Sequence, residues 1–277
     1  MNARSIAPRP DPRDLDRLLA AGAPFARLAA PYFEGLERIP ETRPLLFVGN
    51  HTLYGVLDVP FLFGELWRSR RIFPRALGDH VHFAVPGWRE LLTRLGVVDG
   101  TRENCAALMR AGEAILVFPG GAREVGKRKG ERYRLQWKER LGFARLAAAH
   151  GCTIVPFSAV GADDCYDIVL DGDDFLPTPL GRAARRLGLR EDAMMPLARG
   201  AFGTPLPRPE RFYFHFGEPI AVEADPRDEA AVRAVRDRTR TAVEDGLARM
   251  LAVRAADPDR PLHRRLLRAL RPAVSSS

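Results

Sequence analysis

Short apolar runs alternate with amphipathic segments through the middle of the chain. Short runs bounded by turn residues are typical of buried strands, whereas apolar residues at every third or fourth position are typical of helices. Strands are therefore expected at 45–49, 72–77, 114–118, 153–158, 166–170 and 211–216, and helices at 59–69, 87–95, 102–111, 135–149 and 227–254. This alternation predicts an α/β fold with a mixed, largely parallel sheet flanked by helices.

The N-terminal segment is expected to hold a lead-in followed by amphipathic helices. Residues 1–12 contain three prolines and are interpreted as a disordered lead-in. From Asp14 on, two sets of apolar residues recur at helical spacing, and Gly22 with Pro24 is predicted to split the helix between them. The apolar stripe fits packing on the domain core, and it also fits a helix that lies on a membrane or covers an acyl site.

The last segment has the pattern of a basic amphipathic tail. One helical face carries Leu262, Leu266, Leu267 and Leu270, with histidine and arginines around them. Such a helix suits an anionic lipid surface, and it equally suits packing on the domain. The expected organisation is a lead-in over 1–12, one α/β domain over 13–255 and the tail over 256–277.

Within the domain, the proline-rich segment 171–209 is interpreted as an irregular excursion around a short helix near 181–188, either a lid or loose surface.

Composition restricts the classes of partner and compartment. The formal net charge of +8 favours anionic partners such as lipid headgroups, phosphorylated substrates or nucleic acid. The basic residues are scattered over helices without a strand of interleaved aromatics, which argues against nucleic acid. Three widely spaced cysteines favour neither disulfides nor a paired-cysteine metal site. The sequence shows no secretory signal or membrane-spanning run, so a cytoplasmic location is expected.

The first candidate for chemistry follows the apolar run 45–49. That run ends at Asn50 and His51, and Asp58 lies seven positions after the histidine. Because sites in open α/β folds collect at the carboxyl edge of the sheet, the pair is a candidate general base with its orienting acid. The alternative is a histidine satisfied within a loop.

The second candidate is the loop after 114–118, which reads Pro119-Gly120-Gly121-Ala122-Arg123-Glu124. The two glycines allow a substrate to approach backbone N–H groups, and Arg123 offers a planar cation for phosphate or carboxylate. A tight turn is the alternative. The stretch 121–127 imitates a nucleotide-binding loop, but Arg128 stands where a Ser or Thr should hold magnesium, which disfavours that interpretation.

Other clusters are weaker. The pair His80 and His82 lacks the further ligands that a metal site needs. Six aspartates between 163 and 174 lack the spacing of a calcium loop and are interpreted as a solvated loop. The nucleophile elbow of serine hydrolases is also missing. The sequence therefore predicts neither a metal nor a redox cofactor.

Four blocks in order resemble the glycerolipid acyltransferase family, and the third and fourth are most similar to its diacylglycerol and phytyl-ester acyltransferase-like branch. The blocks are Gly49-Asn50-His51 with Asp58; Gly96-Val97-Val98-Asp99-Gly100-Thr101-Arg102-Glu103-Asn104; Phe118-Pro119-Gly120-Gly121-Ala122-Arg123-Glu124; and Ile154-Val155-Pro156-Phe157. The resemblance extends from about residue 43 to the segment 216–220. It implies a single α/β acyltransferase domain.

The resemblance also implies roles for individual residues. His51 would be the general base that activates an acceptor hydroxyl, and Asp58 would hold its tautomer. Arg123 would bind the acceptor headgroup, and backbone N–H groups at Gly120 and Gly121 would stabilise the oxyanion. From the first two blocks, Asn50 and Arg102 are further substrate-binding candidates.

Two departures from the family pattern matter. The acid usually follows the histidine by five residues, where this chain has Val56, so Asp58 serves only if Gly55 allows an enlarged turn. Gly120 and Ala122 replace a common Glu and Thr, which favours a neutral acceptor over lysophosphatidate.

The implied protein is a peripheral membrane O-acyltransferase. It would move a fatty acyl chain from a thioester carrier, acyl-CoA or acyl carrier protein, to the hydroxyl of a glycerolipid or lysophospholipid. The partners expected are a lipid acceptor, the acyl donor and a membrane surface, without nucleic acid. An inactive lipid-binding protein of the same fold and a thioesterase that uses water as acceptor are the alternatives.

Overall fold

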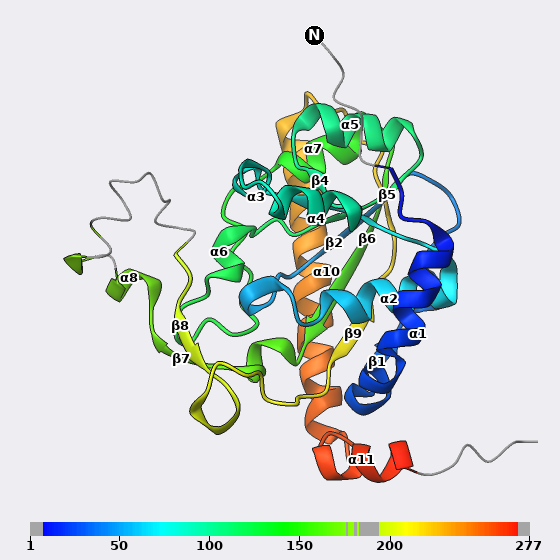
Figure 1. Ribbon diagram of the computed structural model, residues 1–277. Coiled ribbons are helices and arrows are strands. Elements are labelled where there is room, and N and C mark those ends of the chain that lie inside the picture. The colour runs from blue at the N-terminus through cyan, green and yellow to red at the C-terminus, as the bar shows by residue number, and fades with distance from the viewer. Residues whose placement is uncertain (1–7, 176, 180–181, 183–193, 271–277) are drawn as a thin grey trace, which may run out of the picture.

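A central β-sheet with helices on both faces organises the computed structural model, which describes residues 8–175, 177–179, 182 and 194–270 (Figure 1). The helices are α1 (Pro12–Ala29), α2 (Val59–Arg70), α3 (His80–Ala84), α4 (Trp88–Arg94), α5 (Arg102–Arg110), α6 (Ala122–Val125), α7 (Gly142–Ala149), α8 (Gly172–Phe175), α10 (Glu229–Ala256) and α11 (Leu262–Leu270). The strands are β1 (Tyr32–Glu34), β2 (Leu45–Gly49), β3 (Arg75–Gly78), β4 (Val98–Asp99), β5 (Ala114–Val117), β6 (Thr153–Val160), β7 (Asp167–Leu170), β8 (Leu197–Arg199), β9 (Tyr213–Phe216) and β10 (Ile220–Ala221).

The main sheet has the strand order β1-β9-β6-β2-β5-β3-β4, and β10 pairs with β6. Five neighbouring pairs are parallel, and β6 pairs antiparallel with both β9 and β10. The prediction of an α/β fold with a mixed, largely parallel sheet flanked by helices is confirmed. A separate two-stranded antiparallel sheet is formed by β7 and β8.

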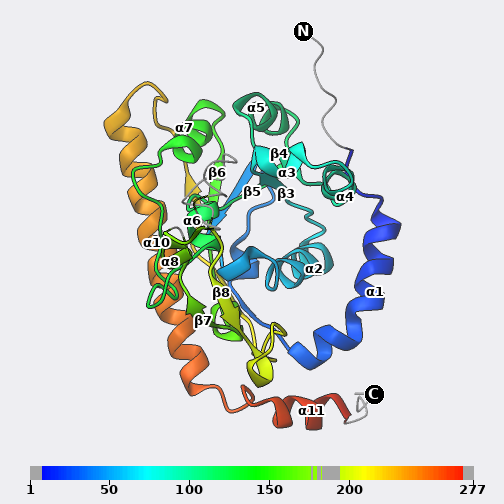
Figure 2. The same cartoon turned by 60° about the vertical axis from the view of Figure 1, so that its left-hand side comes forward.

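Alternating side chains of β2 divide the core into two apolar layers. Leu46 and Val48 belong to a cluster shared with α7 and α10, whereas Leu45 and Phe47 belong to a cluster shared with α2. Figure 2 shows α10 on one side of the sheet and α2 with α1 on the other. Because β2, β5 and β6 are parallel, their carboxyl ends meet at one edge, where the loops that follow them come together.

Helix α1 runs unbroken across Gly22 and Pro24, so the predicted split there is wrong. Both halves pack on α2: Leu19 lies against Gly64, and Phe25 stacks on Phe61 with ring centroids 5.4 Å apart. Contacts on both sides of the proline stabilise a single helix in spite of the hydrogen bond that proline removes. Within the predicted lead-in, Arg9 forms an ion pair with Glu113 at 2.7 Å.

The helix predicted over 135–149 begins only at Gly142. Upstream, Trp137 is fully buried, and Lys138 has a left-handed backbone with φ of 50°. The N–H of Gln136 donates to Glu124 at 2.9 Å instead of to a helical carbonyl. Tertiary contacts at the sheet edge therefore replace the helical hydrogen bonds that the apolar spacing predicts.

Amphipathic helices are present at both ends, as predicted, and α11 lies against the C-terminal end of α1. No helix among the described residues has the length and apolar character to cross a bilayer. The helix expected near 181–188 falls largely outside the described residues. The flanking parts of that segment form α8 and β8.

Candidate active site

Asn50 fixes the chain at the point where β2 ends. Its side chain accepts a hydrogen bond from the N–H of Ala159 at 2.8 Å and donates to the Ala159 carbonyl at 2.9 Å. The residue is 2% exposed, so both polar groups are used within the protein. Asn50 therefore positions the loop that begins at His51, and its role in substrate binding stays a prediction.

The imidazole of His51 lies between an aromatic ring and a glycine. It stacks on Phe118, with ring centroids 3.9 Å apart and planes inclined by 13°. On the other side, a Cβ on Gly55 would come within 2.3 Å of the ring's Cε1. Gly55 also has a φ of 64°, which only glycine adopts without strain. The glycine in the turn thus makes room for the histidine itself.

The backbone of the His51 loop is held by buried charged side chains. Glu124 accepts the N–H of His51 at 2.8 Å, and Lys127 donates to the His51 carbonyl at 2.7 Å. Lys127 also pairs with Asp163 at 2.8 Å, and Asp163 accepts the N–H of Leu53 at 2.7 Å. The Lys127 and Asp163 side chains are 2% and 0% exposed. Three of these contacts, from Glu124 in α6, from Lys127 just after it and from Asp163 just after β6, therefore hold residues 51–53.

The surroundings keep the imidazole neutral. The pKa of His51 is lowered from 6.5 to about 3: burial lowers it most, the Lys127 ammonium also lowers it, and the Asp163 carboxylate opposes both. A general base must be unprotonated before it acts, and this site meets that requirement at neutral pH. Nδ1 of His51 is buried and has no hydrogen-bond partner among the described residues.

Asp58 lies at the start of α2 and is 4% exposed. Its carboxylate accepts the hydroxyl of Thr52 at 2.8 Å, and no hydrogen bond joins it to His51 in the described part of the chain. Burial raises the pKa of Asp58 to about 6, although the Thr52 hydroxyl opposes this. The enlarged turn thus brings the Asp58 carboxylate to Thr52, the residue after His51. The pairing of Asp58 with the imidazole of His51 stays a prediction.

The two glycines of the third block differ in what they offer. The N–H of Gly121 donates to the Phe118 carbonyl at 3.0 Å, which leaves it engaged inside the turn. The N–H of Gly120 has no such bond within the described residues. A Cβ on Gly120 would approach the Glu124 carboxyl carbon to 2.2 Å, so this glycine also allows Glu124 to reach His51. Of the two N–H groups, only that of Gly121 is used inside the turn, and the oxyanion role stays a prediction.

The two predicted substrate-binding arginines lie in different places. Arg123 makes a two-pronged ion pair with Glu131, with N–O distances of 2.5 and 2.8 Å, and is largely covered. Arg102 opens α5 next to β4, three strands from β2, which is about 14 Å at usual strand spacing. The structure therefore brings Arg123 near His51 through α6, but not Arg102, whose role stays a prediction.

Sequence reasoning missed two residues of this site. Asp163 was assigned to a solvated acidic loop, and that interpretation is wrong because the side chain is completely buried. Lys127 appeared only as part of a rejected nucleotide loop. The usable signal was the order of the two segments, since the loops after β5 and β6 must meet beside His51 in a parallel sheet. Among the described residues, no group of His, Cys, Asp and Glu side chains could hold a metal ion.

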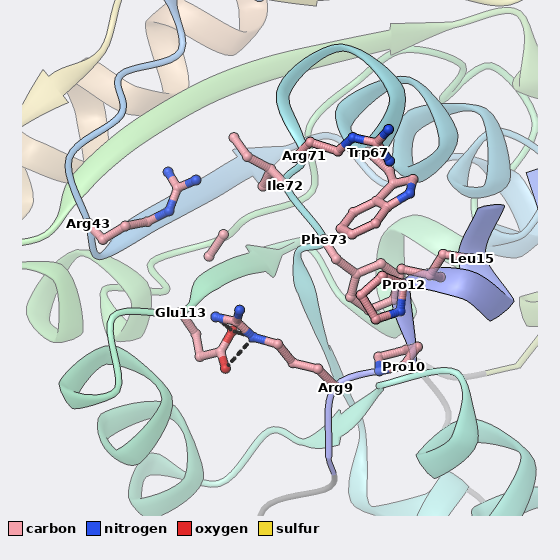
Figure 3. Close-up of a pocket in the computed structure, with 11 residues that line it drawn as sticks. Arg9, Pro10, Pro12, Leu15, Arg43, Trp67, Arg71, Ile72, Phe73 and Glu113 are labelled. Atoms are coloured by element: carbon pink, nitrogen blue, oxygen red, sulfur yellow. Dashed lines mark hydrogen bonds and ion pairs between the residues drawn. The ribbon is translucent and has the colours of Figure 1, made fainter.

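A pocket at the opposite edge of the sheet is separate from this site. It has a volume of about 160 Å³ and is lined by residues that include Arg43, Trp67 and Ala114, the first residue of β5. Figure 3 shows Arg9 joined to Glu113 at its rim. A cavity of this size cannot enclose a lipid, so the pocket does not compete with the His51 site.

These features define a class of protein. A histidine that stacks on an aromatic ring at the carboxyl edge of an α/β sheet, beside a Pro-Gly-Gly turn, agrees with the family model described as Acyltransferase, which matches residues 31–160. The fold is similar to that of the crystal structure of the 1-acyl-sn-glycerophosphate (LPA) acyltransferase PlsC from Thermotoga maritima. The TM-score is 0.54 and the identity 16%, with 87% of this chain and 80% of that chain covered.

Sequence relatives give the family. Phytyl ester synthase 1, chloroplastic, of Arabidopsis thaliana is 31% identical over 253 residues, which cover 84% of this chain and 36% of that protein. The human DGAT1/2-independent enzyme synthesizing storage lipids is 32% identical over 124 residues, which cover 44% of this chain and 37% of that protein. The chain belongs to the glycerolipid acyltransferase family. It spans only about a third of the length of these relatives.

Proposed function

We propose that this protein is an O-acyltransferase that moves an acyl chain from a thioester carrier to the hydroxyl of a lipid, with His51 as general base. The observation that carries the proposal is the neutral imidazole held by stacking on Phe118 at the carboxyl edge of the sheet. The plant relative is named as a phytyl ester synthase and the human relative as an enzyme that synthesizes storage lipids.

The proposed reaction needs one proton carrier. The imidazole of His51 takes the proton of the acceptor hydroxyl while that oxygen attacks the thioester carbonyl carbon. The oxyanion of the tetrahedral intermediate accepts the N–H of Gly120. The C–S bond then breaks, the ester is released, and the thiolate takes the proton back from the imidazolium. Atoms and charge balance without a metal or a redox cofactor.

The finer assignments are part of the proposal. Asp58 would serve as the acidic partner of His51 after exchanging Thr52 for the imidazole, and Arg123 would bind polar groups of the acceptor after loosening its pair with Glu131. The replacement of Glu and Thr by Gly120 and Ala122 supports a neutral acceptor such as a diacylglycerol or a long-chain alcohol. Acyl-CoA and acyl carrier protein are both retained as donors, and the protein would work peripherally at a membrane.

One experiment tests the reaction. The protein is incubated with labelled acyl-CoA or labelled acyl carrier protein and a mixture of diacylglycerol, long-chain alcohol and lysophosphatidate, and products are identified by mass spectrometry. His51→Ala should lower the rate by about 100-fold or more, since it removes the proposed proton acceptor. His150→Ala, at the end of α7, is the matched control and should retain full activity.

Three outcomes separate the candidates. Labelled lipid ester that depends on His51 supports transfer. Thioester cleavage without a labelled lipid would identify a hydrolase that uses water as acceptor. Intact thioester together with bound lipid would identify a binding protein that has the fold without the reaction.

A further inference from the structure

Phe202 is the most exposed large apolar residue of the described chain. Its side chain is 100% accessible, and its backbone has a φ of 54°, the left-handed region that residues other than glycine rarely occupy. Nearby on the same excursion, Leu197 and Leu206 are 64% and 65% exposed. An aromatic ring held outward by an unfavourable backbone indicates a surface that is covered by something apolar.

The loop that carries Phe202 is closed by hydrogen bonds. The N–H of Gly200 donates to Thr204 and the N–H of Ala201 donates to Leu206, both at 2.7 Å, and the Thr204 hydroxyl donates to the Ala201 carbonyl at 2.8 Å. A Cβ on Gly200 would come within 1.9 Å of the Leu206 carbonyl oxygen, so the close turn requires glycine. The ring is therefore presented by a closed loop and not by a loose end of chain.

The same end of the molecule carries α11 and the C-terminal end of α1, as both ribbon views show (Figures 1 and 2). Leu266 and Leu267 on α11 are 42% and 61% exposed, and Phe25 on α1 is 63% exposed. These apolar residues lie on three segments that are distant in sequence. Together with the Phe202 loop they form what we call the apolar end.

Arg265 holds the apolar end together. The side chain is 2% exposed, and its Nη1 donates to the carbonyls of Leu28 at 3.0 Å and Ala29 at 3.3 Å, at the end of α1. Its Nη2 donates to the carbonyl of Pro209, a few residues beyond the Phe202 loop. One buried guanidinium thus fixes α11 against both other segments, and this leaves the leucines of α11 outside.

The charge of the apolar end is positive. The local carboxylates are already paired: Asp257 with Arg211, Asp259 with Arg268, and Glu210 with Arg254 and Arg260. The exposed arginines Arg27, Arg199 and Arg264 have no acidic partner among the described residues. Exposed apolar side chains beside unpaired arginines complement a surface that is apolar inside and anionic outside.

We propose that the apolar end is a docking face for an anionic lipid surface, with Phe202 entering the layer between headgroups and acyl chains. The candidate site is linked to this face, because the hydroxyl of Tyr54 in the His51 loop donates to the carbonyl of Pro196, just before β8, at 2.9 Å. Only the role of this face, which is to bring a lipid hydroxyl toward His51, depends on the proposed function. Binding of the face to vesicles is measured without any acyl transfer.

The test is co-sedimentation of the full chain with vesicles of phosphatidylcholine alone and with vesicles that also contain phosphatidylglycerol. Phe202→Ser should weaken binding to the anionic vesicles by about tenfold, from the lost burial of one aromatic side chain. Arg264→Gln should weaken it by about fivefold and only when phosphatidylglycerol is present. Leu95→Ser, just after α4, where the side chain is 48% exposed at the other end of the molecule, is the matched control and should bind as the parent does.

A second readout locates the ring. The three native cysteines are buried, so Phe202→Cys can be labelled selectively with an environment-sensitive fluorophore. Its emission should move to shorter wavelength on anionic vesicles. An unshifted emission from bound protein, loss of binding in Leu95→Ser instead of Phe202→Ser, or absence of binding by the parent overturns the proposal. Vesicle binding that depends on Phe202 in a protein without acyl transfer would refute the proposed function and leave the docking face intact.

Discussion

Of the buried carboxylates beside the His51 loop, Asp163 and Asp58 differ most in their hydrogen-bond partners. Asp163 has a cation, Lys127, and accepts two backbone N–H groups, from Leu53 at 2.7 Å and Tyr133 at 3.1 Å. Asp58 has one side-chain hydrogen bond, from the Thr52 hydroxyl. Burial raises the pKa of Asp58 to about 6, and no cation among the described residues pairs with it directly, so it becomes protonated just below neutral pH.

The two carboxylates suit two different roles, one that holds a loop in place and one that stabilises a cation formed beside it. A fully compensated carboxylate such as Asp163 suits a permanent structural role, because its charge is matched in the resting protein. Asp58, whose pKa is raised, lacks a charged hydrogen-bond donor in the described part of the chain, and an imidazolium formed during catalysis would be such a donor. The structure thus assigns the loop to Asp163 and keeps Asp58 as the candidate acid.

The largest effect is expected from removing the cation. Lys127→Met leaves Asp163 buried and unpaired, which should lower the free energy of unfolding by about 3–5 kcal/mol. Urea unfolding at neutral pH measures this. The double variant Lys127→Met with Asp163→Asn removes both charges and should be clearly more stable than the single variant. Equal loss in both would mean that the pair does not act as a unit.

Asp58→Asn should change the pH dependence of stability. The folded pKa of Asp58, about 6, lies above its usual 3.8, so the folded state binds more protons between these values and the wild type loses stability as pH rises through this window. The variant lacks this loss. Its free energy of unfolding minus that of the wild type should therefore be up to about 3 kcal/mol larger at pH 7.5 than at pH 4. Unfolding curves at both pH values measure the difference. The same difference from wild type at both would contradict the assignment.

Thr52→Val should have the smallest effect, about 1 kcal/mol, since it removes one buried hydrogen bond at constant shape. Because the hydroxyl lowers the pKa of Asp58, its loss should move the pH dependence of stability to higher pH. Thr239→Val is the control: it removes a buried hydroxyl that donates to the Val235 carbonyl within α10, at 2.8 Å. A pH shift in the control would show that the effect is not specific to Asp58.

The sheet was predictable because its strands are short apolar runs that the fold buries on both faces. Leu45, Leu46, Phe47 and Val48 are each fully buried, so no solvent-facing position interrupts the pattern. The errors came where distant contacts outweigh local preference. Packing on α2 carries α1 through Pro24, and contacts with Glu124 and the core unwind the segment before α7.

The sequence predicts which loops form the candidate site, but not which side chains pair within it. The motifs around His51 and Gly120 follow strands and so identify the edge where they meet. Which carboxylate is solvated depends on side chains far along the chain: Asp163 meets Lys127 across 36 positions, and spacing alone carries no sign of that pairing. Nor does it show that Arg123 is matched by Glu131.

Asn50 shows how the sheet ends beside His51. A side-chain amide carries the same donor and acceptor as a peptide unit, and Asn50 places both opposite the backbone of Ala159, one residue beyond the last backbone of β2. The side chain therefore adds a final rung to the ladder between β2 and β6 while the main chain is already turning away. The last pair of hydrogen bonds between these two strands is thus made by a side chain, and His51 is the first residue beyond the ladder.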